Sequence, residues 1–457
     1  MNSDSMKIKG FLCVLAFVVA VFGPGAASAN QYELIDLGTL GGIKSYAYGI
    51  NDSGQVVGYS KNSDGDYHAF FWNGIDMIDL GTLGGDKSCA YGINDSGQVV
   101  GYSRNSDRKY RAFLWNGTDM IDLGTLGGDR SYAYGIDFFG QAVGYSKNSD
   151  GDYRAFFWKN NAMTGLGTLG GSRSYAYGMN ALFHVVGKAH NSAGEYHAFL
   201  WMAEVMTDLG TLGGTDSEAC GINNSGQTVG CSTTVDGETH AVLWNNTEIQ
   251  DLGTLGGGQS EAYGINDAGQ VVGQSNTSDG VLCAFIWTCN QMTDLNTLIV
   301  PDSGWVLQEA RSINRNGWIV GNGSDPSGNV RAFLLKPAAQ PQSIRGRITA
   351  GSLHYDDAPI QNACVSIEGT ELVTHTDENG KFVILNVPVG VHTIHVTSDY
   401  FEKTIDDLTV SEGADVKFSE ADGSVSLKAP LSGDANGNAD IDLGDAVSIL
   451  KSLIKKK

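Results

Sequence analysis

Apolar and polar residues alternate in short blocks along most of the chain, and the blocks recur with a fixed period. In one period the apolar runs are "AYGIN" (90–94), "QVVGYS" (98–103), "RAFLW" (111–115) and "MIDLG" (120–124). Asn, Asp, Ser and Gly fill the connections, which is typical of tight turns. The pattern predicts four short antiparallel strands in each period. The periods start at Leu34, Met77, Met120, Met163, Met206, Ile249 and Met292.

The third run of each period has no polar position that alternates with the apolar ones. "AFFW" (69–72) is apolar throughout, and such a strand needs both of its faces covered, as in stacked propeller sheets. One Trp recurs in this run, at 72, 115, 158, 201, 244 and 287, with Leu335 in the last copy. A Trp ladder can stack on sugars, but six copies at one apolar position favour packing between sheets.

The two ends of the array predict that it closes. The array begins with a lone fourth strand, "QYELIDLG" (31–38), and ends with a third strand, "VRAFLLK" (330–336). The opening strand can therefore complete the last sheet, and a ring leaves only short, protected strand edges. The same period suits an open solenoid, but a solenoid needs capping units and the sequence shows none. We therefore expect a seven-bladed β-propeller over residues 30–337.

The phrase "LGTLGG" marks each crossing from one predicted sheet to the next. It occurs at 37–42, 80–85, 123–128, 166–171, 209–214 and 252–257, a constant step of 43 residues. Its glycines supply tight backbone approaches, and Gly97 in the "DSG" turn is expected in the left-handed conformation. No helix or Lys follows the phrase, so a phosphate-binding role is disfavoured.

These residues carry a family resemblance. "HAFFW" (68–72), "HAFLW" (197–201) and "HAVLW" (240–244), with the recurring "DLGTLGG" and "GINDSGQVVG", resemble the HAF-type extracellular repeat. The resemblance covers roughly residues 31–337 and implies a secreted protein. Two copies depart from it: "MNALFHVVG" (179–187) lacks the turn Gly, and an insertion surrounds "IVPDSGW" (299–305).

Charge and the N-terminus restrict the location and partners. The net charge of -22 disfavours nucleic-acid binding and suits solubility or attraction of divalent cations. Residues 1–29 read as a signal peptide: Lys7 and Lys9 precede the apolar run 11–22, and "ASA" (27–29) offers cleavage after Ala29. No later segment is apolar enough to span a membrane. The expected location is secreted, extracellular or cell-surface associated.

Six cysteines follow the predicted cleavage site. Cys220 and Cys231 both replace tyrosines of one repeat, and a disulfide between them depends on strand register, which the sequence leaves open. Cys283 and Cys289 lie six residues apart around one strand, too far to bond if extended. No cysteine or histidine spacing indicates a transition-metal site.

After a linker at 338–342, residues 343–428 alternate apolar and polar positions between turns, which predicts a small antiparallel β-sandwich. "TDENGKFVILNVPVG" (376–390) resembles the carboxypeptidase-regulatory-like, transthyretin-like family. Such modules are usually non-catalytic, and their fold class is shared with carbohydrate-binding domains. His375, His392 and His395 are interpreted as surface residues of alternating strands.

The last segment, 432–457, carries the spacing of a calcium loop. In "DANGNADIDLGD" (434–445) the residues at positions 1, 3, 5, 7, 9 and 12 are Asp434, Asn436, Asn438, Asp440, Asp442 and Asp445. Ca²⁺ needs such converging oxygens, with a backbone carbonyl at position 7. The apolar spacing of "DAVSILKSLI" (445–454) predicts a short amphipathic helix. The segment resembles one dockerin repeat, which implies docking to a cohesin-like protein. Ala439 replaces the usual turn Gly, and dockerins have two repeats where this chain shows one; the alternative is an acidic solvated loop.

The sequence shows no catalytic constellation. His68, His197 and His240 share their repeat position with Arg111, Arg154, Arg331 and Cys283, whereas a catalytic base belongs to one sheet only. The Asp column at 36, 79, 122, 208, 251 and 294 is read as a turn-capping position. We therefore expect a non-catalytic scaffold that binds an extracellular glycan or protein. The alternative is a polysaccharide-degrading propeller enzyme tethered through its tail, and two or more non-repeated acids or histidines at the channel mouth would favour it.

Overall fold

The structure is a computed structural model that describes residues 12–16, residues 32–338 except 247, and strands within 344–428. Its contacts divide the chain into two units, Ser28–Ala338 and a second unit that joins Met1–Ala27 to Ala339–Lys457. The predicted linker residues 339–342, residues 376–380 and the predicted tail at 429–457 lie outside the described residues. Each unit is described by itself.

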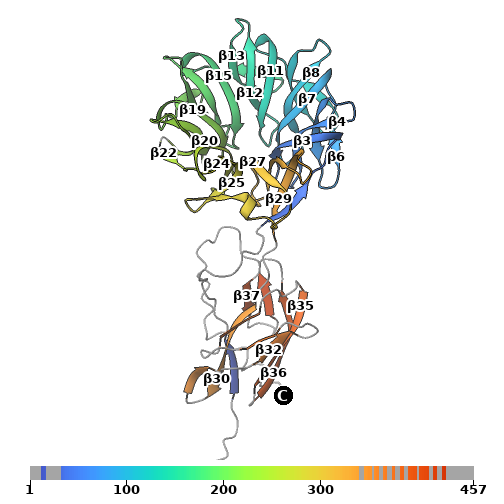
Figure 1. The fold of residues 1–457 in the computed structure, drawn as a ribbon, viewed down its shortest axis with the longest axis vertical. Helices are drawn as coiled ribbons and strands as arrows, with labels where there is room; N and C mark the ends of the chain where they lie inside the picture. Colours follow the sequence, from blue (N-terminus) through green and yellow to red (C-terminus); the bar gives the residue numbers. More distant parts are fainter. Residues whose placement is uncertain are drawn as a thin grey trace, which may run out of the picture. The chain divides into compact units, whose positions relative to one another are not determined.

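Ser28–Ala338 is all-β and consists of successive four-stranded antiparallel sheets, typical of a β-propeller (Figure 1). In chain order the sheets are β3 (Gly41–Ile50), β4 (Val56–Asn62), β5 (Tyr67–Trp72) and β6 (Met77–Asp79); β7 (Gly84–Ile93), β8 (Val99–Asn105), β9 (Tyr110–Trp115) and β10 (Met120–Asp122); β11 (Gly127–Ile136), β12 (Ala142–Asn148), β13 (Tyr153–Lys159) and β14 (Ala162–Gly165); β15 (Gly170–Met179), β16 (Val185–Asn191), β17 (Tyr196–Met202) and β18 (Val205–Asp208); β19 (Gly213–Ile222), β20 (Gln227–Thr234), β21 (Thr239–Asn245) and β22 (Glu248–Asp251); β23 (Gly256–Ile265), β24 (Val271–Thr277), β25 (Leu282–Thr288) and β26 (Gln291–Asp294). One parallel pairing, Thr239 with Gln259, links the β19–β22 and β23–β26 sheets.

The last sheet takes one strand from each end of the array. β27 (Val306–Ile313), β28 (Ile319–Ser324) and β29 (Val330–Pro337) are completed by β2 (Tyr32–Asp36), which pairs antiparallel with β29 so that Leu34 lies opposite Leu335. The predicted pairing of residues 31–38 with 330–336 is therefore confirmed. Just before the insertion at 299–305, Leu295–Thr297 form a short 3-10 helix, η1, and the carbonyl of the next residue, Leu298, accepts a hydrogen bond from the Tyr32 N–H.

The first strands of the sheets lie next to one another around a common centre. Each contacts the first strands of both neighbouring sheets, and β27 contacts β3 (Figure 1). Two faces follow from the strand directions. We call the end that holds the turns between first and second strands the turn face, and the opposite end, where the chain passes between sheets, the crossing face.

The phrase "LGTLGG" joins each sheet to its predecessor through a buried serine. Ser88 Oγ donates to the Gly81 carbonyl of the crossing and accepts the Ala69 N–H from β5 of the preceding sheet. The same bond recurs around the array, and Ala332 N–H donates to Ser45 Oγ between the last sheet and the first. The predicted first strand starts too late: the sequence predicts "AYGIN" (90–94), but β7 begins at Gly84, so the last two glycines of the phrase belong to the strand.

The core lies between the sheets, as the apolar third strands predict. Phe70, Trp72, Val56 and Leu334 pack in one such layer. Trp72, Trp158, Trp244, Trp287 and Leu335 are buried, and Trp115 and Trp201 are partly buried, so the packing interpretation of this column is confirmed. Gly97 has φ 75°, as predicted for its turn.

The second unit forms two four-stranded sheets and a hairpin. One sheet contains β30 (Ile344–Ser352), β31 (Tyr355–Pro359), β34 (Lys381–Ile384) and β1 (Leu12–Ala16). The other contains β33 (Val373–His375), β32 (Cys364–Ile367), β35 (Gly390–Ser398) and β36 (Phe401–Val410); β37 (Asp415–Phe418) and β38 (Val425–Lys428) form the hairpin. β1 falls within the predicted signal peptide, so cleavage after Ala29 would remove it from its sheet.

Candidate functional site

The centre of the turn face holds a depression of about 240 Å³. Every sheet contributes the same three positions to it, namely the end of the first strand and the two residues that follow. In the β3–β6 sheet these are Ile50, Asn51 and Asp52, and in the last sheet Ile313, Asn314 and Arg315. The depression is therefore built from the repeated "GIND" segment.

A ring of asparagines holds the mouth of this depression together. Asn51 Nδ2 donates to the Asn94 carbonyl of the next sheet at 3.1 Å and to Gln55 Oε1 of its own turn at 2.7 Å. Asn314 Nδ2 donates to the Asn51 carbonyl at 3.0 Å, between the last sheet and the first. The side-chain amides thus connect adjacent sheets through buried hydrogen bonds.

The ring has one chemical exception, Asp137 in the β11–β14 sheet. Asn94 donates to the Asp137 carbonyl at 2.8 Å. The Asp137 carboxylate has no amide hydrogen, so it cannot donate to the carbonyl of the next sheet in turn. Accordingly, Asp137 Oδ2 and Gln141 Oε1 are both buried without a hydrogen-bond partner in the described structure. Burial raises the pKa of Asp137, against the effect of backbone N–H donors.

The mouth has one polar side and one aromatic side. On the polar side, the Arg315 guanidinium lies 3.3 Å from Asp52 Oδ2 and 3.2 Å from Asp267 Oδ2, and is 59% exposed. On the other side, Phe138 and Phe139 replace the Asp and Ser of the turn and are 64% and 70% exposed. Exposed apolar side chains grouped beside a depression are typical of binding surfaces.

The next sheet extends the aromatic side. Phe183 takes the turn position that Gly97 and Gly140 hold elsewhere, with φ 62°, and its ring centroid lies 6.2 Å from that of Phe139. A left-handed Phe costs about 1–2 kcal/mol relative to Gly. Strain of this kind is typically retained at functional positions. The repeat that lacks the turn Gly, 179–187, is the one that places Phe183 on the aromatic side of the mouth.

Below the mouth, the first strands line the channel with tyrosines in half of the ring. Tyr48, Tyr91, Tyr134 and Tyr177 lie at one repeat position, with adjacent ring centroids 4.6–5.4 Å apart. In the remaining sheets Cys220, Tyr263 and Arg311 occupy that position. The tyrosine rings therefore pack against one another along this half of the channel.

The other half of the channel holds charges. Two residues earlier on the strand, glutamates stand where most other sheets have Tyr: Glu218, Glu261 and Glu309. Lys188 Nζ lies 2.6 Å from Glu218 Oε2, Arg311 lies 2.8 Å from Glu309, and Tyr263 donates to Glu261 at 2.5 Å. Each carboxylate thus has a partner within the protein.

Cys220 and Cys231 also lie in this charged half, and both are free thiols. Burial raises the pKa of each thiol, with further increases from nearby glutamates. The thiols therefore stay protonated at neutral pH. Cys283 is buried and Cys289 exposed, and both are free.

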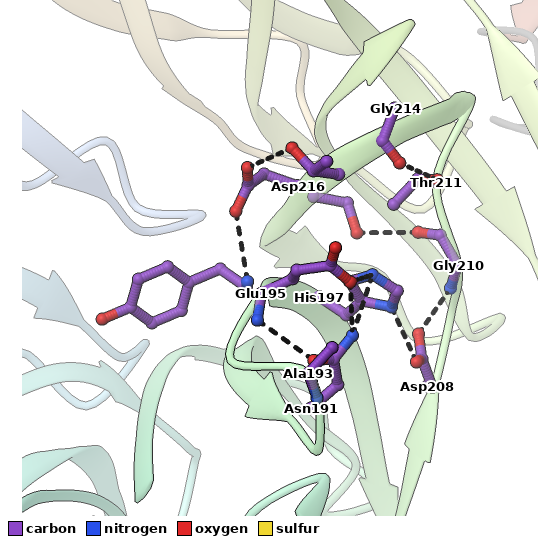
Figure 2. A network of polar contacts seen from close by, with 12 residues as sticks. Asn191, Ala193, Glu195, His197, Asp208, Gly210, Thr211, Gly214 and Asp216 are labelled. Carbon is purple, nitrogen blue, oxygen red and sulfur yellow. Dashed lines mark hydrogen bonds and ion pairs between the residues drawn. The ribbon is translucent and has the colours of Figure 1, made fainter. Parts of the chain in front are cut away.

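The histidines of the repeat pair with the Asp column across the third and fourth strands. Figure 2 shows His197, whose Nδ1 lies 2.7 Å from Asp208 Oδ2 while Asp208 Oδ1 accepts the Gly210 N–H. His68 pairs with Asp79 and His240 with Asp251 in the same way, both at 2.8 Å. Glu195 Oε2 lies 3.9 Å from His197 Nε2 and accepts from Asn191 Nδ2. The turn-capping interpretation of the Asp column is confirmed.

The structure does not describe the predicted metal ligands, and the sequence analysis did not predict the residues of the mouth. Asp434, Asn436, Asn438, Asp440, Asp442 and Asp445 lie outside the described residues. Sequence reasoning missed Asp137, Phe138 and the channel glutamates, although each was visible as a departure from its repeat column. Among the described residues, no cluster of three or more His, Cys, Asp or Glu is arranged to hold a metal ion, and no helix there is long and apolar enough to cross a membrane.

Comparison with known proteins identifies one module. Residues 343–420 match the carboxypeptidase regulatory-like domain family. This segment therefore contains that domain, as its sequence predicted. The comparison with curated proteins returned no match.

Solved structures resemble this chain only at low identity and with TM-scores below 0.5. A puromycin-hydrolyzing peptidase of Mycobacterium tuberculosis is 12% identical, with TM-score 0.44, over 81% of this chain and 62% of its own. TolB of Acinetobacter baumannii is 9% identical, with TM-score 0.38, over 62% and 64%. The SapL1 lectin in complex with alpha methyl fucoside is 11% identical, with TM-score 0.24, over 80% and 97%. This chain thus spans less than two thirds of the peptidase and of TolB.

Proposed function

We propose that the protein is a secreted, non-catalytic binding scaffold whose propeller holds an extracellular glycan at the turn-face mouth. The observation that carries this proposal is the two-sided mouth, with Phe138 and Phe139 opposite the Arg315–Asp52–Asp267 cluster. A sugar ring has an apolar face and a rim of hydroxyls. The aromatic side suits the apolar face of the sugar. The carboxylates and the guanidinium suit its hydroxyls.

A binding role also agrees with the pairing of the repeat histidines to carboxylates. His68, His197 and His240 recur as paired, turn-fixing residues, and the same column holds Arg elsewhere. A catalytic base needs one unique, available group within reach of its substrate. The paired histidines therefore support a structural role for this column.

The test is glycan binding by the full chain and by a mouth variant. A glycan array would select a ligand, and calorimetry would compare the parent with Phe138→Asp plus Phe139→Ser, which restores the repeat residues. We expect at least about tenfold weaker binding in the variant, equivalent to roughly 1.4 kcal/mol. Val235→Ser, which removes another exposed apolar side chain on the crossing face, is the control. Equal affinity of the mouth variant and parent would refute the proposal.

The alternative, a polysaccharide-degrading enzyme, is favoured by one observation. Glu218, Glu261 and Glu309 are acids that the first sheets lack, although they lie inside the channel and have partners. Release of reducing ends from extracellular polysaccharides, lost in Glu261→Gln, would support this alternative. Binding without release supports the scaffold.

The propeller itself is proposed to have seven blades, supported by the pairing of β2 with β29 and by the contact of β27 with β3. Secretion is supported by the signal-like residues 1–29. We further propose that the tail binds Ca²⁺ through the 434–445 loop and docks to a cohesin-like protein. The oxygen-ligand spacing of that loop supports this step.

A further inference from the structure

The crossing face carries a repeated association of cations with tyrosines in three successive sheets. At the start of the third strands, Tyr67, Tyr110 and Tyr153 each have a cation from the end of the second strand over the ring: Lys61 at 5.4 Å, Arg104 at 5.0 Å and Lys147 at 5.6 Å from the centroid. In the next sheet His190 takes the place of the cation, and its ring centroid lies 4.0 Å from that of Tyr196, the last tyrosine of the column. The following sheets have Thr239, Leu282 and Val330 at this position. The association is therefore confined to one arc of the ring.

A second column of cations borders the same arc. Lys87, Arg130 and Arg173 lie on the first strands of the sheets that follow Tyr67, Tyr110 and Tyr153. Lys87 Nζ lies 5.7 Å from the Tyr67 centroid, so this ring has an ammonium from each of two sheets. Beyond the arc, the same column becomes Asp216 and Gln259. We call Lys61, Tyr67, Lys87 and their counterparts the basic–tyrosine strip.

Some cations of the strip are neutralised within the protein and others are not. Asp86 lies 3.0 Å from Arg104, and Asp129 lies 3.7 Å from Lys147 and 3.9 Å from Arg130. Among the described residues, Lys61 and Lys87 form no ion pair with a carboxylate. Two ammonium groups beside one ring repel each other, and an anion between them would relieve that repulsion.

We propose that the basic–tyrosine strip binds an acidic polysaccharide, whose carboxylate or sulfate groups lie at the paired cations, Lys61 and Lys87 first. Cations that recur from sheet to sheet suit a polymer whose charge recurs from sugar to sugar. The half-buried tyrosines beside them offer ring faces and hydroxyls to the sugar rings. The strip lies on the face opposite the mouth, so it is a second surface beyond the glycan site proposed above.

A nucleic acid fits this surface less well. Duplex DNA carries a charge about every 1.7 Å, and the protein's net charge of -22 repels so dense a polyanion more strongly than a polymer with one charge per sugar. Double-stranded DNA is therefore included in the test as a competing ligand.

The experiment measures binding of the full chain to immobilised polygalacturonate, dextran sulfate, neutral dextran and duplex DNA between roughly 50 and 200 mM salt. We expect binding to polygalacturonate or dextran sulfate that weakens as salt rises, and none to dextran. Lys61→Ala plus Lys87→Ala should weaken binding at least about tenfold, and Lys61→Arg plus Lys87→Arg should retain most of it. Lys336→Ala is the matched control, because Lys336 also lies over an aromatic ring, Trp318, at 4.5 Å.

The outcomes separate this inference from the mouth proposal. Unchanged binding in the double alanine variant, tighter binding to DNA that depends on the same lysines, or failure of both acidic polysaccharides to bind would each overturn it. Phe138→Asp plus Phe139→Ser should leave polyanion binding unchanged. Loss of neutral-glycan binding alone therefore concerns the mouth, and loss of polyanion binding alone concerns the strip.

Discussion

Replacing Asp137 with Asn should repair the one defect in the asparagine ring. In the β7–β10 sheet, Asn94 Nδ2 reaches both Gln98 Oε1 at 2.9 Å and the carbonyl of the next sheet at 2.8 Å. Asp137 has no such donor, and Asp137 Oδ2 and Gln141 Oε1 are left buried and unpaired. Asp137→Asn replaces the unpaired carboxylate oxygen with an NH₂ group, which can donate to Gln141 Oε1 and to the carbonyl of the next sheet.

The size of the expected gain in the free energy of unfolding follows from the two unpaired atoms, Asp137 Oδ2 and Gln141 Oε1. A buried unsatisfied polar group costs about 1–3 kcal/mol, and Asp137 is only 6% exposed. We expect Asp137→Asn to raise the free energy of unfolding by about 1–2 kcal/mol at neutral pH. For a domain of this size, that is a rise of a few degrees in Tm.

The gain should depend on pH. Because burial raises the pKa of Asp137 in the folded state, the protonated acid can donate a hydrogen bond, and the parent's stability from this group is present at low pH and lost as pH rises through the raised pKa. The difference between parent and Asp137→Asn should therefore be largest at neutral pH. It should shrink as pH falls toward about 4, the ordinary aspartate range.

Urea unfolding followed by tryptophan fluorescence measures this prediction, since all 8 Trp residues lie between 72 and 318 in the propeller. Asn94→Asp is the matched control, because it introduces the same defect in the neighbouring sheet and should destabilise by a similar amount. A lower or unchanged midpoint for Asp137→Asn at neutral pH, or a gain that persists unchanged at low pH, would refute the reasoning.

Three further predictions follow from other parts of the molecule. Gly144→Ala should destabilise by about 3 kcal/mol or more, because its Cβ would overlap the Tyr132 carbonyl; Gly151→Ala, which has open space but φ 87°, should cost only about 1–2 kcal/mol in the same thermal melt. His197→Arg should change stability by less than about 1 kcal/mol and leave glycan binding intact, because the His–Asp pair is partly exposed; a large loss of binding with an unchanged melt would instead indicate a functional histidine. Calcium titration of the full chain should show a binding event that Asp434→Ala weakens at least about tenfold, and identical isotherms for the two chains would remove the calcium proposal.

The sequence predicted the sheets well because the relevant physics is local and repeated. The apolar third strands, the turn residues and the recurring Trp each constrain a single sheet, and the unmatched end strands predicted the β2–β29 pairing. Strand starts were less accurate: Gly84 and Gly85 look like a connection in the sequence, yet they extend β7.

The site was harder to predict because it arises from residues that differ between copies and meet only in the ring. Asp137 looks like a minor change from Asn until the amide ring shows that a donor is missing. Phe138 and Phe183 belong to different repeats and become one aromatic surface only when their sheets are adjacent. The Cys220–Cys231 pair shows the same limit, since register alone left its state open and the structure has both thiols free.

Closure of the ring is the claim on which both proposed surfaces depend, and a cross-link tests it most directly. Glu33 and Lys336 face each other between β2 and β29, so Glu33→Cys plus Lys336→Cys, in a chain with exposed Cys289 replaced by Ser, should form an intramolecular disulfide on mild oxidation. Mass spectrometry of the proteolysed, unreduced protein should recover the peptides around positions 33 and 336 joined within one chain. Recovery of these peptides unlinked, or linked only between chains, would contradict the closed ring.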